Sequence, residues 1–257
     1  MQIPIITPYI HKKLKAAHVR RAKLTIDRQL IYQRQKAGSI DTKKAARIDQ
    51  YYTAQASSLK SYLRSFREFS KTDRILEVGS GAHGHIFFMG LPDAIGVDPL
   101  ADEYQKIFPH WQPRASTLVA YGEQLPFEDA YFDVVISDNV VDHAEDPQKI
   151  INEMVRVLAP GGLLYFTVHV HHKLYGLVSR ILLFVYALYL PAKLGPFADH
   201  TVHFGVDEVA RLSTDFPLCS STNRTILRLH SHWRSKHHHV ILATDSNVCF
   251  SRMQLSS

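Results

Sequence analysis

Two neighbouring segments of the chain carry the residue types of a nucleotide-binding pocket. Residues 74–84 read RILEVGSGAHG, an apolar run that ends in Glu77 and a glycine-rich turn, and a second apolar run, residues 95–97, ends in Asp98. Glycine allows a sharp turn and a close backbone approach to a ligand. An acid at the end of the next strand can accept two hydrogen bonds from a ribose diol. The two segments together predict a pocket at the carboxyl edge of a parallel sheet.

Five motifs in order resemble the class I S-adenosylmethionine-dependent methyltransferases, in the group typified by small-molecule and lipid methylation. They span roughly residues 70–170, and the ordered series is more specific than any one motif. The chain departs from the family in having His83 where a third glycine is usual, with the glycine one place later at Gly84, and Tyr121 where an acid is common. The motifs are residues 76–81 (LEVGSG), 96–98 (GVD), 122–127 (GEQLPF), 132–137 (FDVVIS) and 157–162 (VLAPGG).

The resemblance implies S-adenosylmethionine as the cofactor and assigns residues to it. It places Glu77, Gly79, Ser80 and Gly81 along the methionine and ribose side, and Asp98 at the ribose hydroxyls. It places Pro99 or Leu100 over the adenine face, and Gly122 and Glu123 beside the adenine. Ser137, Asp138 and Asn139 fall near the methionine amino group. Because Asp98 also precedes an expected helix, it can cap that helix as well, and the two roles can coexist.

Histidines are the candidate acid–base and acceptor-binding residues. His143 follows the fourth expected strand at a position where related enzymes often carry a histidine, and its pKa range suits proton removal from a hydroxyl acceptor. The alternative is that it packs and bonds a loop carbonyl. His169, His171 and His203 are expected on the acceptor side. We expect no metal site, because no carboxylate or cysteine cluster accompanies the histidines.

Alternating strand and helix patterns predict a Rossmann-like, doubly wound α/β fold with a mostly parallel seven-stranded sheet. Strands are expected at residues 74–78, 94–98, 116–121, 133–138, 163–170, 225–230 and 239–243. Helices are expected at residues 9–37, from 41 or 42 to about 69, from 82 to just before Pro92, and at 101–108, 147–158 and 206–213. The domain organisation predicted is a basic helical extension, residues 1–70, before an S-adenosylmethionine-binding domain, residues 71–257.

Charge is distributed unevenly between these two parts. Residues 1–70 carry 15 Lys and Arg against 4 Asp and Glu, while the other 187 residues carry 15 against 20. Such an extension either contacts an anionic partner or is a solvated helix whose charges only keep it soluble. We expect a cytoplasmic protein with reduced cysteines, because no secretory signal pattern is visible.

One segment, Leu174–Leu190, is almost continuously apolar, with Arg180 its only charge. At 17 residues it lies at the short limit for crossing a bilayer. A span here would also separate the last two strands from the sheet, which argues against it. The remaining alternatives are a helix buried between strands, or a lid or membrane-facing helix for an apolar substrate.

Two functions of different class fit the motifs. The first is a methyltransferase that acts on oxygen or carbon of a small or amphiphilic acceptor, with peripheral contact to an anionic membrane. The alternative is a catalytically inactive S-adenosylmethionine-binding protein that docks on a membrane or nucleic acid through its basic helices. The intact acids and glycines favour the first. Nucleic-acid methylation is disfavoured, because the Pro-Pro-aromatic signature of base-methylating enzymes is absent after residue 137.

Overall fold

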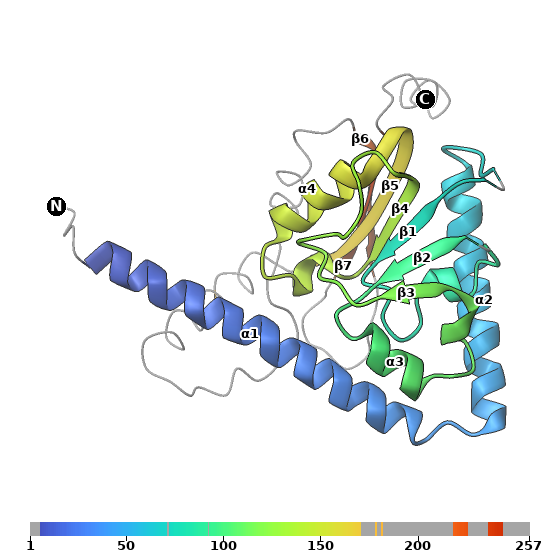
Figure 1. The fold of residues 1–257 in the computed structure, drawn as a ribbon, viewed down its shortest axis with the longest axis horizontal. Coiled ribbons are helices and arrows are strands. Elements are labelled where there is room, and N and C mark those ends of the chain that lie inside the picture. Colours follow the sequence, from blue (N-terminus) through green and yellow to red (C-terminus); the bar gives the residue numbers. More distant parts are fainter. Residues whose placement is uncertain are drawn as a thin grey trace.

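A parallel sheet of five strands forms the centre of the computed structural model of this chain (Figure 1). The structure describes residues 6–70, 72–91, 93–170, 178, 181, 218–225 and 236–243. The parallel strands are β1 (Ile75–Val78), β2 (Ala94–Val97), β3 (Ser116–Leu118), β4 (Phe132–Asp138) and β5 (Leu158–Val170). The predicted doubly wound α/β fold is confirmed.

The strand order places a topological switch point between β1 and β4. Along the sheet the strands follow the order β3-β2-β1-β4-β5-β7-β6, so the chain first builds outwards from β1 and then returns to its other side. In open α/β sheets, ligands bind beyond the carboxyl ends of the strands at this point. The glycine turn after β1 and the end of β4 at Asp138 therefore meet where a ligand is expected.

Two further strands extend the sheet with antiparallel pairing. They are β6 (Leu218–Thr225) and β7 (Lys236–Ala243), and β7 lies between β5 and β6. The prediction of a strand at residues 239–243 falls inside β7. Of the strand predicted at residues 225–230, only Thr225 is described, as the last residue of β6, and residues 226–230 lie outside the described residues.

Helices cover both faces of the parallel strands, which explains why all four residues of β1 are buried. Leu76 and Val78 point to the face covered by α4 (Pro147–Val157), which contributes Ile150, Ile151 and Met154. Ile75 belongs to the opposite face, which is covered by α2 (Thr42–Arg64) and α3 (Ala101–Ile107). Figure 1 shows α2 and α4 on opposite sides of the sheet.

The N-terminal part of the chain forms two long helices, α1 (Ile6–Ala37) and α2. The break at Gly38 lies where predicted, and Asp41 caps α2 by accepting a hydrogen bond from the Lys44 N–H at 2.7 Å. The C-terminal end of α1 lies beside α3, where Arg34 pairs with Glu103 at 2.6 Å, and its N-terminal end projects away from the sheet (Figure 1).

The structure corrects two predicted elements of the core. The helix predicted from Ala82 to just before Pro92 is only the single turn η1 (His85–Phe87), because Gly84 starts it and Gly90, at a φ of +61°, follows it closely. Strand β5 begins at Leu158 rather than Leu163. Residues 160–162, which were predicted only to end the preceding helix, are part of the strand and form an irregularity in its pairing with β4.

Other predicted elements lie outside the described residues. The expected helix at residues 206–213 is among them, and so is most of Leu174–Leu190, of which Val178 and Ile181 are described and exposed. In the described part of the chain, no helix is both long enough and apolar enough to cross a membrane.

Candidate cofactor site

The glycine turn after β1 is fastened to the neighbouring strand by its backbone. The Gly79 and Ser80 N–H groups donate to the Val97 carbonyl at 2.7 and 3.1 Å. Gly79 has a φ of +73°, and a Cβ there would lie 2.3 Å from Cγ2 of Val140. Gly81 also has a positive φ, +54°, but a Cβ there would meet only the Gly79 carbonyl oxygen, at 3.8 Å. Gly79 is therefore required by packing, while Gly81 borders open space.

Glu77 organises the other end of the turn. Its Oε1 accepts a hydrogen bond from the His85 N–H and its Oε2 from the Ile86 N–H, both at 3.0 Å. The side chain is 2% exposed, and burial raises the pKa of its carboxyl, against the opposing effects of His85 and the two backbone bonds. A Cβ on Gly84 would lie 2.6 Å from Oε2 of Glu77. Only glycine at position 84 therefore leaves room for the Glu77 carboxylate.

Asp98 connects the same turn to the start of α3. Its Oδ2 accepts from the Gly81 N–H at 3.0 Å and its Oδ1 from the Leu100 N–H at 2.8 Å. Burial raises the pKa of Asp98 to about 6, although both backbone bonds favour the ionised form. Each carboxylate oxygen keeps a second lone pair that a ribose hydroxyl could use. The helix-entry contact is observed, and ribose binding stays a prediction. Pro99 is half-buried beside it.

His83, which stands at the usual third-glycine position, packs into an aromatic cluster. Its ring stacks on Tyr52 of α2, with centroids 4.7 Å apart, and lies 4.9 Å from the rings of Phe108 and Trp111. Burial, and secondarily the nearby Lys36, lower the pKa of His83 to about 3, so the ring is neutral. The departure from the family pattern is a packing feature that joins the turn to α2.

The predicted adenine-side residues have local structural contacts. A Cβ on Gly122 would lie 2.3 Å from Cδ1 of Ile150, so this glycine allows the loop to pack on α4. Glu123 Oε1 accepts from the Glu145 and Asp146 N–H groups at 2.8 and 3.4 Å, at the start of α4. Their contact with adenine stays a prediction.

Within the described part of the chain, buried polar atoms without a protein partner lie around the switch point, which fits a ligand there. Buried and without a hydrogen-bond partner among the described residues are Ser80 Oγ, Ser137 Oγ and Asn139 Oδ1, all on predicted cofactor residues. Asn139 has a φ of +59°, and its N–H donates to Thr167 Oγ1 at 2.9 Å. A strained residue beside unsatisfied polar groups is typical of a functional site.

The candidate acid–base residues are placed only in part. His143 ends the single turn η3 (Val141–His143), where its N–H donates to the Val140 carbonyl at 2.8 Å. His169 Nδ1 lies 3.5 Å from Oδ2 of Asp142, a fully buried carboxylate. His171 and His203 lie outside the described residues. Among the described residues, no cluster of three metal-ligating side chains is present.

Two contacts at this edge were not expected from the sequence. His85 Nε2 lies 2.9 Å from Asp138 Oδ2, and Asp142 lies beside His169. Asp142 could have been singled out from the sequence, because an acid directly after the apolar pair Val140–Val141 is unusual for a buried turn. The contact of His85 could not have been found in this way, because its partner Asp138 is distant in the sequence.

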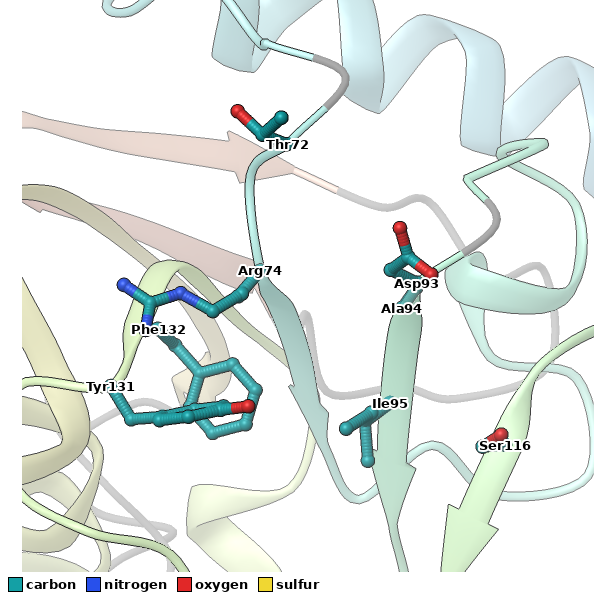
Figure 2. Close-up of a pocket in the computed structure, with 8 residues that line it drawn as sticks. All are labelled: Thr72, Arg74, Asp93, Ala94, Ile95, Ser116, Tyr131 and Phe132. Carbon is teal, nitrogen blue, oxygen red and sulfur yellow. The ribbon is translucent and has the colours of Figure 1, made fainter.

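A separate pocket lies at the opposite end of the strands. Figure 2 shows its lining at the amino ends of β1 to β4, with the arrowheads of the strands pointing away from the labelled residues. Its volume is about 380 Å³. Arg74 stacks over the Tyr131 ring at 4.7 Å and pairs with Asp133 at 3.2 Å. This pocket is not the cofactor site.

Comparison with known proteins agrees with this geometry. Residues 76–166 match the family described as a methyltransferase domain. An uncharacterised methyltransferase of Mycobacterium leprae (strain Br4923) is 41% identical over 95 residues, which cover 35% of this chain and 35% of that protein. The chain thus spans about a third of the length of this relative.

Solved structures share the fold. The YcgJ protein from Bacillus subtilis has a TM-score of 0.54 at 15% identity, covering 73% of this chain and 97% of that one. A geranyl diphosphate C-methyltransferase from Streptomyces coelicolor A3(2), in complex with geranyl diphosphate, Mg²⁺ and S-adenosyl-L-homocysteine, has a TM-score of 0.54 at 13% identity, covering 74% and 77%. The domain match over residues 76–166 and the shared fold support a class I S-adenosylmethionine-dependent methyltransferase, a family whose cofactor is S-adenosylmethionine.

Proposed function

We propose that this protein transfers a methyl group from S-adenosylmethionine to oxygen or carbon of a small or amphiphilic acceptor. The observation that carries the proposal is the turn at the switch point. There Glu77 and Asp98 hold the backbone of a glycine loop beside unsatisfied buried polar atoms. A site prepared in this way suits a ligand that the backbone must approach closely.

The reaction asks the chain mainly to bind and to orient. When bound, the cofactor supplies an activated methyl group on sulfur. In our proposal Asp98 accepts from the ribose hydroxyls, the loop at Gly122 borders the adenine, and the end of β4 faces the methionine end. Positioning of this kind can supply much of the rate of a displacement reaction.

We place the acceptor beside the histidines that follow β4 and β5. His143 lies on the loop after β4, and His169 lies at the end of β5 against the buried Asp142. In this proposal His143 takes the proton that a hydroxyl acceptor loses, while His169, His171 and His203 line the acceptor side. A structural neighbour is named for geranyl diphosphate, a molecule with an apolar chain and a charged end. An amphiphilic acceptor of this kind is consistent with the proposal.

Binding of S-adenosylhomocysteine, the demethylated product, tests the proposal by calorimetry. We expect the wild type to bind it and Gly81→Ala to bind it at least tenfold more weakly, because the added methyl occupies the open space beside the turn. Gly161→Ala is the matched control, since Gly161 also has a positive φ, +73°, with nothing within 4 Å, but lies at the bulge in β5. Both variants should lose about 1 kcal/mol of folding stability.

Two outcomes would contradict the proposal. One is absence of S-adenosylhomocysteine binding to the folded wild type, with binding of NADH in its place. The other is equal affinity of both glycine variants for S-adenosylhomocysteine, which would show that the glycine turn does not contact the ligand.

A further inference from the structure

The pocket at the amino ends of β1 to β4 exists because no crossover helix covers that part of the sheet (Figure 2). The chain passes from β3 to β4 through residues 119–131 without forming a helix. Ile95 of β2 and its register partner Ser116 of β3 therefore lie on an uncovered face, and both line the pocket, whose volume is about 380 Å³. This face leaves room for a small molecule at the edge opposite the proposed cofactor site.

Strand pairing brings two opposite charges together in this pocket. Arg74 and Asp93 come directly before Ile75 and Ala94, which pair in the parallel ladder of β1 and β2. They therefore begin neighbouring strands, which are spaced about 4.8 Å apart in a sheet. Both side chains line the pocket, and in Figure 2 Arg74 lies on the Tyr131 side of β1 while Asp93 lies at the start of β2. The pocket thus has one positive and one negative wall.

Arg74 does not pair with Asp93, because other contacts hold its guanidinium. Its Nε donates to Oδ2 of Asp133 at 3.2 Å, and its backbone N–H donates to the same oxygen at 2.8 Å. The guanidinium also lies over the Tyr131 ring, 4.7 Å from the centroid. Within the described residues, Nη1 and Nη2 of Arg74 and the carboxylate of Asp93 have no hydrogen-bond or ion-pair partner. These donors and acceptors are available to a ligand.

We propose that this pocket binds an α-amino acid with an apolar side chain. The Nη atoms of Arg74 donate to the ligand carboxylate as a fork, and the Asp93 carboxylate accepts from its ammonium group. A ligand of one charge would meet a like charge on one wall, whereas an α-amino acid carries both charges on one carbon. Ala94, Ile95 and Phe132 line the pocket beside these groups and suit an apolar side chain.

This site is separate from the proposed cofactor site and does not depend on the proposed function. Arg74 precedes the amino end of β1, whereas the glycine turn follows its carboxyl end. Because S-adenosylhomocysteine has an amino-acid end of its own, a free amino acid could occupy the cofactor site instead. Saturating the protein with S-adenosylhomocysteine separates the two sites, since an amino acid should then still bind beside Arg74.

Titration of the full chain with L-leucine, followed by NMR, tests the proposal. With and without saturating S-adenosylhomocysteine, the resonances of Ile95 and Tyr131 should shift and reach a plateau. Two probes remove one charge each: 4-methylpentanoate lacks the ammonium group of leucine, and 3-methylbutylamine lacks its carboxylate. Each should bind at least ~10-fold more weakly than L-leucine, the scale of one charge-assisted hydrogen bond.

The Asp93→Asn variant isolates one wall of the pocket. It should bind L-leucine at least ~10-fold more weakly but 4-methylpentanoate no more weakly than the wild type, because only the ammonium group loses its acceptor. Its melting temperature should not change, since Asp93 is exposed and unpartnered among the described residues. Glu128→Gln is the matched control, because Glu128 is an exposed acid that does not line the pocket, and it should bind L-leucine as the wild type does.

Four outcomes would overturn the inference. They are the absence of a saturable L-leucine shift in the wild type, equal affinity of the wild type and Asp93→Asn for L-leucine, equal binding of L-leucine and 3-methylbutylamine, and loss of the shifts when S-adenosylhomocysteine is added. The last of these would place the amino acid in the cofactor site.

Discussion

Glu77 and Asp98 each accept hydrogen bonds from two backbone N–H groups. These N–H groups belong to the loops that we propose contact the cofactor. Both carboxylates are buried, and burial raises the pKa of each. The cost of desolvating them is offset by bonds that fix the turn before any ligand arrives. Preorganisation of this kind reduces the ordering that binding would otherwise require.

Asp98 gives the cofactor site a dependence on acid pH. Its pKa is raised to about 6, and protonation removes the negative acceptor that ribose hydroxyls would use. We therefore expect affinity for 5′-methylthioadenosine to be constant from pH 7 to 8 and to fall as pH drops below about 6. Asp98→Ala should weaken binding by ~10–100-fold at pH 7. Calorimetry across this range measures both effects.

The Asp98→Asn variant checks this assignment, because it cannot titrate and should remove the acid limb of the profile. A melting temperature that falls in Asp98→Ala with no change in ligand affinity would show that Asp98 serves only the start of α3.

Residue roles were only partly predictable from the sequence. The types and spacing of Glu77, Gly79 and Asp98 located the turn, because those residues are adjacent along the chain or end neighbouring strands. The pairing of His85 with Asp138 joins residues 53 positions apart. No local pattern encodes such a contact, which depends on how β1 and β4 lie side by side.

At the scale of elements, one arginine fastens the loop after β3 to α4. Arg156 donates to the carbonyls of Phe127 and Leu125 at 2.9 and 3.1 Å, and it also pairs with Glu153 and Asp129. Glu153 in turn accepts from the Leu125 N–H at 2.8 Å. This loop begins with the residues proposed beside the adenine, so α4 positions that part of the site.

We expect Arg156→Met to destabilise the protein by about 1–3 kcal/mol, because two backbone carbonyls lose their charged donor. Thermal unfolding measures the loss. Lys106→Met is the control, because among the described residues Lys106 bonds only the half-buried Glu103 carboxylate, and its loss should leave the melting temperature unchanged. Equal melting temperatures for Arg156→Met and the wild type would show that the loop is held by its apolar contacts alone.

The order of the core helices and strands could be predicted from the sequence, but the residues at which several of them begin and end could not. Strands β1, β2 and β4 have short apolar runs closed by acids or glycines, and these signals are local. The helix expected after β1 fails because Glu77 takes the N–H groups of His85 and Ile86, and α2, from an earlier part of the chain, packs against this turn instead. Tertiary contacts overrode local propensity there.

At the scale of the whole molecule, the positive charge is concentrated in the helices that precede the sheet. Helix α1 has nine Lys and Arg and one acid in 32 residues. Exposed Lys15, Val19 and Lys23 follow one another at four-residue spacing, on the side away from the buried Ala17. Exposed Leu24, Ile31 and Tyr32 add apolar surface. The basic side chains can attract the surface of an anionic membrane.

We therefore propose that α1 brings the enzyme to an anionic membrane, where an amphiphilic acceptor would be found. Lys15→Gln with Lys23→Gln should weaken binding to vesicles containing phosphatidylglycerol by ~30-fold, at about 1 kcal/mol per basic residue. Sedimentation measures this, and the binding should fade with added salt. The matched control replaces Lys106 and Lys149, exposed lysines of the sheet domain, and should leave vesicle binding unchanged. Wild-type protein that stays in the supernatant with these vesicles at low salt would refute membrane contact, and the charge of α1 would then serve only solubility.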